Sequence, residues 1–452
     1  MYFNYSFSIV IFSLFLSLLN NASSQAEDWS RFRGPNGSGV SLESTDVPTS
    51  WSPSENLRWK TQLPGSGVSS PIVVGDRVFV TCYSGYGLNR ENPGEIKNLK
   101  RHLVCIDRKS GKKRWGKIVD VTLPEDPYSG IGVTAHGYAS HTPVSDGQHV
   151  FVFFGKSGVI AYDMDGNQLW QKSVGTESDP RKWGSSSSPI LQGNKLIITA
   201  AAESQSIVAL DKASGDELWR QEATSLDNSW STPILVTTKA GRIELVLNVA
   251  GEVWGLNPET GKLIWYCSTS DADQAQSSAV VDSQRVVYTI SGRGGASAAI
   301  KVGGKGDVSD THLAWTGRET SRFGSPILHK GKLYLVASGV VSSIDVKSGE
   351  RSSQIRLESE SEGEESSGGG RSRGGRGGFG SLDYASPVIS GENLFYLKST
   401  GEMFVFKISD KLEQIAVNKV SDETESFGGT PAISNNQLFI RSNKHLYCVG
   451  TE

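Results

Sequence analysis

The sequence predicts an all-β fold, an eight-bladed β-propeller of four-stranded antiparallel blades in which a strand near the N-terminus completes the last blade. Three observations predict it: a repeat that opens eight times, a turn motif that ends in tryptophan, and a final repeat that lacks its fourth strand. The composition agrees, because 51 glycines and 11 tryptophans in 452 residues suit many strands and tight turns better than packed helices.

Each repeat opens with a small residue that is usually followed by proline. A short apolar strand, a turn such as Gly75-Asp76 and an alternating strand such as residues 77–81 come after the opening. The openings are Ser70-Pro71, Thr142-Pro143, Ser188-Pro189, Thr232-Pro233, Ser278-Ala279, Ser325-Pro326, Ser386-Pro387 and Thr430-Pro431.

A turn motif joins the third and fourth strands of most repeats. In its clearest copy, Asp211 ends a strand, Gly215 lies in the turn and Trp219 lies in the next strand. The aspartate can bond its own turn backbone, the glycine supplies a positive φ, and the tryptophan offers a flat face to the neighbouring sheet. We therefore expect structural docking tryptophans at Trp59, Trp115, Trp170, Trp219, Trp265 and Trp315.

The last repeat predicts how the ring closes. Residues 430–449 supply only three strands before the sequence ends, whereas residues 56–61, before the first opening, look like a fourth strand that contains Trp59. A radial arrangement of sheets covers both faces of each sheet and most of its edges. We therefore expect the N-terminal strand to complete the eighth blade.

The Asp-to-Gly-to-Trp units resemble the tryptophan-docking repeats of the pyrroloquinoline-quinone (PQQ) enzyme superfamily, from about Asn56 to Val449. Residues 29–39 also resemble the N-terminal signature of a group of exported bacterial propellers that carry these repeats. The resemblance implies the fold, whereas its members include both redox enzymes and propellers without known chemistry.

Three regions are predicted along the chain. Residues 1–26 read as a signal peptide, because residues 7–19 are apolar and uncharged and small residues precede a cleavage point after Ala26. Residues 27–55 form an N-terminal extension, and residues 56–452 form a single propeller with a Glu/Gly/Arg-rich insert at about 358–381 that should be disordered. We expect an exported protein of the periplasm or cell envelope, with no lipid-attachment cysteine near the cleavage point and no transmembrane segment after cleavage.

Charge and cysteine content limit the partners. A net charge of −3 implies no general attraction to nucleic acid. Of four cysteines, Cys82 and Cys105 fall on strands that we expect to be neighbours, so a disulfide and two free core cysteines both remain open. We expect a monomer.

The longest connections all emerge on one face of the predicted ring, and aromatic residues precede the inner strands there. The predicted ligand-binding residues at the mouth of the central channel are Trp183, Trp230, Gln276, Arg322, Phe323, Tyr384 and His141, with His136 and Phe427 nearby. The alternative is that these rings only pack blade against blade. We predict no metal site, because two histidines five residues apart in an irregular loop do not set a coordination geometry.

Two functions remain open. The first is a non-catalytic binding or scaffold propeller that recognises a protein or small ligand on the loop-rich face, similar to the propeller subunit of the outer-membrane protein assembly machinery. The second, implied by the resemblance, is a PQQ-dependent dehydrogenase that acts on alcohols or sugars with Ca²⁺; Arg293 and Arg322 would then hold the cofactor carboxylates. We assign no catalytic residue and no cofactor under the first hypothesis.

Overall fold

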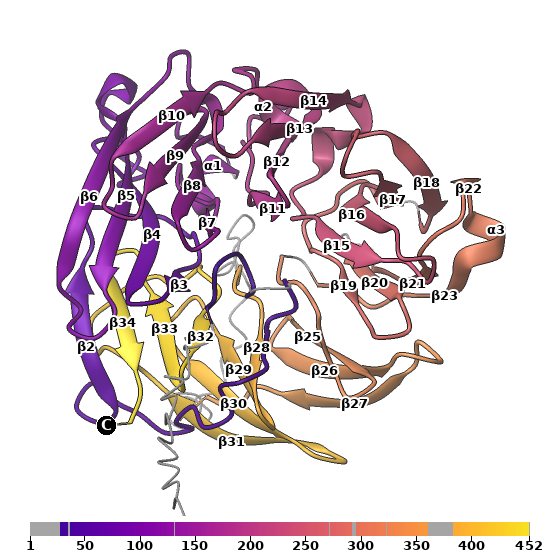
Figure 1. Cartoon of the computed structure of the whole chain (residues 1–452). Coiled ribbons are helices and arrows are strands. Elements are labelled where there is room, and N and C mark those ends of the chain that lie inside the picture. The colour runs from indigo at the N-terminus through magenta and orange to yellow at the C-terminus, as the bar shows by residue number, and fades with distance from the viewer. Residues whose placement is uncertain are drawn as a thin grey trace, which may run out of the picture.

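Eight sheets are arranged in a ring around a central axis in the computed structural model of the chain (Figure 1). The structure describes residues 28–34, 37–130, 132–270, 272–291, 295–321, 323–359 and 383–451. Each sheet has four antiparallel strands, in chain order except that β2 supplies the outer strand of the last sheet, and two sheets carry a short fifth strand. The predicted eight-bladed propeller is therefore confirmed.

In each of the first four blades, the first strand lies nearest the axis and the fourth lies outermost. The strands are β3 (Ile72–Val74), β4 (Arg77–Ser84), β5 (Lys100–Asp107) and β6 (Lys113–Asp120) in blade 1; β7 (Val144–Ser145), β8 (His149–Phe153), β9 (Val159–Asp163) and β10 (Gln168–Lys172) in blade 2; β11 (Ile190–Gln192), β12 (Lys195–Ala200), β13 (Ser206–Asp211) and β14 (Glu217–Glu222) in blade 3; and β15 (Ile234–Thr237), β16 (Ile243–Val249), β17 (Glu252–Leu256) and β18 (Leu263–Ser268) in blade 4.

The remaining blades follow the same order. They comprise β19 (Val280–Val281), β20 (Val286–Ser291), β21 (Ala296–Lys301) and β23 (Leu313–Gly317) in blade 5; β24 (Ile327–His329), β25 (Lys332–Ala337), β26 (Val340–Asp345) and β27 (Arg351–Arg356) in blade 6; β28 (Val388–Ser390), β29 (Asn393–Leu397), β30 (Met403–Ile408) and β31 (Leu412–Asn418) in blade 7; and β32 (Ala432–Ser434), β33 (Gln437–Arg441), β34 (His445–Val449) and β2 (Leu57–Gln62) in blade 8.

Strand β2 closes the ring as the sequence predicts. It pairs antiparallel with β34, and Trp59 lies opposite Cys448. The Trp59 ring packs near Phe439, with ring centroids 6.0 Å apart, and its indole nitrogen donates to the carbonyl of Arg108 in blade 1 at 2.9 Å. One tryptophan therefore ties blade 8 to blade 1 across the seam.

The other docking tryptophans repeat this contact, with one difference. Trp115, Trp170, Trp219 and Trp315 each donate to a backbone carbonyl in the turn of the next blade, at 2.8–3.1 Å. Trp265 instead donates to Glu244 of its own blade at 2.8 Å and is fully buried.

An extra strand explains why Trp265 differs. In blade 5 the connection that should hold the receiving turn carries β22 (Gly306–Asp307) and α3 (Ser309–His312) instead. Strand β22 runs parallel to β18, with Gly306 opposite Trp265. It therefore covers the outer edge of blade 4, across which the Trp265 ring would otherwise reach blade 5.

Each docking ring needs a glycine opposite it. Gly215 has a φ of +77°, and a Cβ added there would lie 2.7 Å from the Trp170 ring. We expect Gly215→Val to destabilise the protein by about 3 kcal/mol, because the variant strains the backbone and displaces the ring. Urea unfolding measures this cost. Gly193→Val is the matched control, since Gly193 has a similar φ of +59° but no heavy atom within 4 Å of an added Cβ; equal losses in the two variants would contradict the docking role.

Apolar clusters between neighbouring blades form the core. Cys105 of β5, for example, packs in the interface between blades 1 and 2 beside Phe79 and Ile160. All four cysteines are free and buried, so the disulfide between Cys82 and Cys105 does not form. The two lie three residue pairs apart along the β4–β5 ladder, which is roughly 10 Å of strand and too far for a bridge.

The N-terminal segment crosses the centre of the ring, where Figure 1 shows it in indigo. Trp29 bridges to Val73 in blade 1, and β1 (Val40–Ser41) adds in parallel to β28 in blade 7. Between them, Arg31 donates to the carbonyl of Pro233 at 3.1 Å, and Arg33 donates to that of Pro326. The segment thus ties blades on opposite sides of the axis together.

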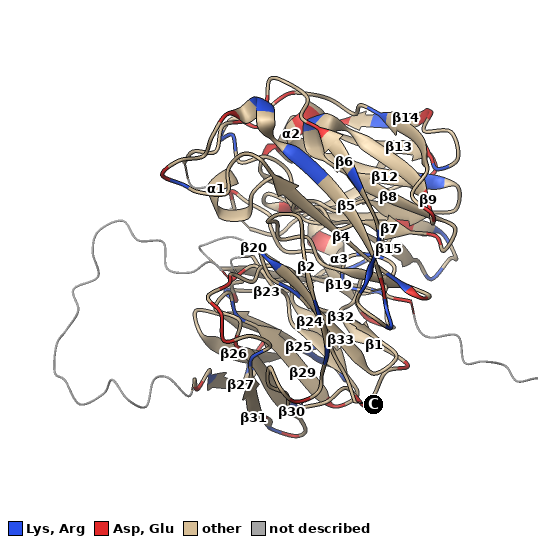
Figure 2. Ribbon diagram, turned by 90° about the vertical axis from the view of Figure 1, so that its left-hand side faces the viewer, with Lys and Arg blue, Asp and Glu red and all other residues tan. Residues whose placement is uncertain are grey.

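The long connections of blades 1 and 2 form a small cluster on one face, on the left in Figure 2 beside α1 (Val133–His136). Tyr83, Tyr86 and Tyr138 are its buried aromatic members. A second short helix, α2 (Ala201–Ser204), follows β12 in blade 3. No helix within the described residues combines the length and apolarity needed to span a membrane.

Candidate functional site

A cavity of about 1170 Å³, open solvent at its mouth included, lies on the axis of the ring on the loop-rich face. Its walls are the segments that lead into the inner strands of the blades. Phe32 from the N-terminal segment also lines it, so the segment that crosses the ring contributes to the cavity wall. The cavity therefore has contributions from every blade and from the extension.

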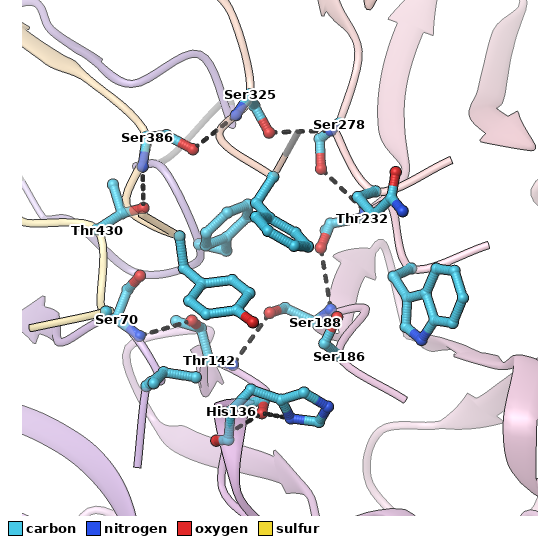
Figure 3. Close-up of a pocket in the computed structure, with 18 of the residues that line it drawn as sticks. Ser70, His136, Thr142, Ser186, Ser188, Thr232, Ser278, Ser325, Ser386 and Thr430 are labelled. Atoms are coloured by element: carbon cyan, nitrogen blue, oxygen red, sulfur yellow. Dashed lines mark hydrogen bonds between the residues drawn. The ribbon is translucent and has the colours of Figure 1, made fainter. Parts of the chain in front are cut away.

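A belt of hydroxyl side chains encircles this cavity (Figure 3). At seven of the eight blade openings, all except Ser70, the Ser or Thr hydroxyl accepts a hydrogen bond from the backbone N–H of the preceding blade's opening residue, at 2.9–3.0 Å. The members are Ser70, Thr142, Ser188, Thr232, Ser278, Ser325, Ser386 and Thr430. The belt explains why a small hydroxyl residue opens each repeat: it links neighbouring blades and turns a polar atom towards the axis.

Two aromatic pairs rise above the belt. The rings of Trp183 and Trp230, which precede blades 3 and 4, have centroids 5.5 Å apart at an interplanar angle of 30°. The rings of Phe323 and Tyr384, which precede blades 6 and 7, have centroids 4.5 Å apart at 41°. All four side chains are half-buried and line the cavity, so they offer apolar faces to a ligand.

Hydrogen bonds hold the tryptophan pair in place. The Trp230 indole donates to the carbonyl of Gly184 at 2.7 Å, and His136 bonds the carbonyl of Trp183 through Nε2 at 2.8 Å. His136 Nδ1 meets the Ser140 hydroxyl at 2.7 Å, and burial lowers the pKa of His136. His136 is therefore a neutral positioning residue with both ring nitrogens engaged.

The cavity lining is uncharged wherever the structure describes it. It contains Ser, Thr, Gln, Gly, Val, neutral His136 and aromatic residues, and no Asp, Glu, Lys or Arg. Gln276 donates to Gln274 at 2.7 Å, and both line the wall near blade 5. Such a lining suits a neutral ligand with apolar faces and a few hydrogen-bonding groups.

The predicted site residues are only partly brought together. Trp183, Trp230, Gln276, Phe323 and Tyr384 line the axial cavity. Arg322 and Arg293 lie outside the described residues.

His141 and Phe427 point elsewhere. His141 is buried in a side chamber, where the centroids of its ring and of the Phe153 ring in blade 2 are 4.4 Å apart. Phe427 packs against Gly401 and Tyr447, as the blade-packing alternative expects.

The side chamber lies beyond His136 and Trp183, between blades 2 and 3, with a volume of about 430 Å³ that includes open solvent. Two buried ion pairs line it: Arg101 with Glu125 at 2.5 Å, and Lys156 with Asp126 at 3.3 Å. Glu203 on α2 also faces it.

One group of side chains among the described residues could hold a metal ion by ligand type and spacing: Glu423 and Glu425 in the connection from blade 7 to blade 8, and His445 of β34. Each already has a protein partner. Lys60 pairs with Glu423, while His445 and the Tyr447 hydroxyl bond Glu425. This cluster is separate from both cavities.

Two parts of the site are absent from the sequence prediction. The sequence analysis recognised the small residues of the hydroxyl belt as a repeat but did not place them on a cavity wall. The hydroxyl that recurs at each of the eight openings is the signal that could have indicated this role. Phe32 gave no signal, because no periodicity connects the extension to the axis.

Comparisons with known proteins agree with the fold. A family model described as outer membrane protein assembly factor BamB matches residues 99–355. The crystal structure of BamB from Moraxella catarrhalis superposes with a TM-score of 0.55 at 12% identity, covering 87% of this chain and 98% of that one. A computationally designed protein, Ika8, gives 0.53 at 13% identity, covering 86% and 99%. At such identities these two likenesses show the fold alone.

A curated relative carries a different description. Polyvinylalcohol dehydrogenase from Pseudomonas sp. is 22% identical over 315 residues, which is 50% of this chain and 47% of that protein. The chain thus spans about half the length of the curated relative it matches. The family model, in contrast, covers more than half of this chain. The chain therefore belongs to the family of PQQ-repeat propellers described as outer membrane protein assembly factor BamB.

Proposed function

We propose that the chain is an exported binding propeller of the cell envelope that holds a neutral ligand, a peptide segment or a small molecule, in its axial cavity without transforming it. The observation that carries the proposal is an uncharged cavity with two half-buried aromatic pairs above a ring of hydroxyls. Membership of a family named for outer membrane protein assembly supports the envelope location and the binding role.

The aromatic pairs would supply most of the affinity. Half-buried aromatic side chains in the centre of a concave site are the usual binding hot spots. The belt and the Gln274–Gln276 pair would fix orientation by hydrogen bonds. Because no described lining residue carries a charge, affinity should depend only weakly on salt.

Calorimetric titration tests this proposal. Peptides selected from a display library and a panel of neutral small molecules are titrated into the protein, and the best ligand is then titrated into variants. We expect Trp230→Ala to weaken binding at least tenfold, which is about 1.4 kcal/mol. Trp219→Ala is the matched control, since it removes an indole that docks on Pro258 away from the cavity. Equal affinity in Trp230→Ala, or no ligand from either source, would contradict the proposal.

The similarity to polyvinylalcohol dehydrogenase favours a second candidate, a dehydrogenase that uses PQQ and Ca²⁺. The described residues of the axial cavity do not fit that pair: PQQ carries three carboxylates and Ca²⁺ needs several oxygen ligands, usually including carboxylates, yet no described cation or carboxylate lines the cavity. Dye reduction by the purified protein with PQQ, Ca²⁺ and either polyvinyl alcohol or small alcohols would establish this candidate against the binding proposal.

A further inference from the structure

The side chamber between blades 2 and 3 contains one buried carboxylate without an ion-pair partner among the described residues. Glu203 is 3% exposed, and its Oε1 accepts a hydrogen bond from the Ser185 hydroxyl at 2.5 Å. Its other oxygen, Oε2, is buried and has no hydrogen-bond partner. Burying such a group without a partner costs several kcal/mol, so the chamber lacks a donor at this point.

A second unpartnered acceptor belongs to His141, which also lines the chamber. Ser185 has one hydroxyl proton, and it donates this proton to Glu203, so the Ser185 oxygen accepts from His141 Nε2 at 3.0 Å. His141 Nε2 therefore carries the proton, and Nδ1 is left as an acceptor. His141 Nδ1 is also buried without a partner. Burial lowers the pKa of His141 to about 3, so the ring is neutral near pH 7 and cannot neutralise Glu203.

The cations of the chamber are already engaged. Arg101 bonds Glu125, the Ser157 hydroxyl and the Tyr138 carbonyl, and Lys156 bonds Asp126 and the Ser178 hydroxyl at 2.7 Å. These two pairs cancel in charge. Glu203 is thus the excess buried negative charge, and a donor that is also a cation would satisfy its unpartnered oxygen.

We propose that this chamber binds a primary ammonium group, with Glu203 as its counter-ion and Glu203 Oε2 as the acceptor of one of its N–H donors. An ammonium carries three N–H donors on a compact positive charge, which matches an excess carboxylate with one unpartnered oxygen. The group can come from a free amine or from a peptide N-terminus. The chamber adjoins the axial cavity and shares His136, Ser140 and Trp183 with it, but Glu203 lines only the chamber, so the inference does not depend on the function proposed for the axial cavity.

Protonation of Glu203 gives the site a pH signature. Burial raises the pKa of Glu203 to about 7, and its ionisable or charged neighbours in the chamber are His141, His136, Lys156, Arg101, Glu125, Asp126 and Glu177. An ammonium binds the ionised carboxylate, so binding near pH 7 releases a proton. Affinity for an alkylammonium, which stays protonated over this range, should rise about tenfold from pH 6 to pH 8 and then level off, since ionised Glu203 increases from about a tenth to about nine-tenths of the population.

Calorimetry on the full-length protein tests the site with defined probes. Methylammonium represents a free amine, Gly-Gly a peptide N-terminus, and N-acetyl-Gly-Gly and tetramethylammonium are probes without a primary ammonium. We expect at least one of the first two to bind, with proton release in buffers of different ionisation enthalpy, and neither of the last two. Binding by tetramethylammonium or N-acetyl-Gly-Gly, or no binding by either primary ammonium, would overturn the proposal and leave a water-filled chamber.

Variants separate the carboxylate from the fold. Glu203→Gln should reduce affinity more than tenfold and abolish the pH dependence, whereas Glu177→Gln, the same change at an exposed carboxylate of the chamber, should alter affinity less than twofold. Thermal unfolding at pH 8 should show an unchanged or raised Tm for Glu203→Gln, because the variant removes a buried charge. Unchanged ammonium affinity in a folded Glu203→Gln protein would overturn the assignment.

Discussion

A chain that begins at residue 63 is expected to lose its cooperative unfolding transition, whereas a chain that begins at residue 56 is expected to keep one. The difference between the two is β2. Without β2, the β34 edge and the partly buried face that Leu57 and Trp59 cover are exposed, and no docking ring reaches the Arg108 carbonyl. An unpaired apolar edge of this kind favours aggregation over folding.

Circular dichroism and urea unfolding of the two truncated chains measure the effect. Both lack the segment that crosses the ring, including fully buried Trp29 and Arg33, so both should be less stable than the longer chain. The comparison between them isolates the closing strand. Equal urea midpoints for the chains starting at 56 and 63 would show that the seam does not depend on β2.

Trp265→Ala is expected to destabilise the protein by about 4 kcal/mol or more, the largest effect of a single substitution in the ring. The indole is fully buried, packs closely against Gly255 and donates to Glu244, a carboxylate whose side chain is itself fully buried. Truncation leaves a large void and removes one donor from this buried carboxylate. Arg242 remains bonded to the other oxygen of Glu244 and limits the loss.

Urea unfolding of Trp265→Ala against Trp219→Ala checks this difference. Trp219 is only partly buried and docks on a backbone carbonyl, so we expect its truncation to cost about 2 kcal/mol. Trp265→Phe is a further control, because it refills most of the void without the donor. A loss in Trp265→Ala no greater than in Trp219→Ala would contradict a special role for the Glu244 contact.

The blade count and the closing strand were predictable because both follow from repetition. The opening recurs eight times, which fixes the number of blades. The last repeat lacks one strand, and a segment with Trp59 near the other end of the chain can supply it, so few other ways of closing the ring remain. Departures from the repeat were harder to see. Trp265 fits the motif by spacing, but its contact depends on β22, which arises in the following blade and pairs with β18 from outside.

For the candidate site, the sequence could predict only which residues surround the central axis. Residues that precede inner strands must surround the axis, which is why Trp183, Trp230, Gln276, Phe323 and Tyr384 line one cavity. Whether such a side chain turns to the axis or between blades depends on its rotamer and neighbours, and His141 and Phe427 turn between blades. The side chamber depends on Glu203 of α2 and on loop residues far apart in the sequence, which no local pattern connects.

Protection of a thiol inside the axial cavity is the most direct test that a ligand binds there. All four native cysteines are buried, so the thiol introduced by Ser186→Cys on the cavity wall would be the reactive one. Ser214→Cys, on an exposed turn of blade 3, is the matched control. We predict that the peptide or small molecule selected by calorimetry slows maleimide labelling of Ser186→Cys but not of Ser214→Cys. Equal labelling rates of Ser186→Cys with and without saturating ligand would contradict binding in the axial cavity.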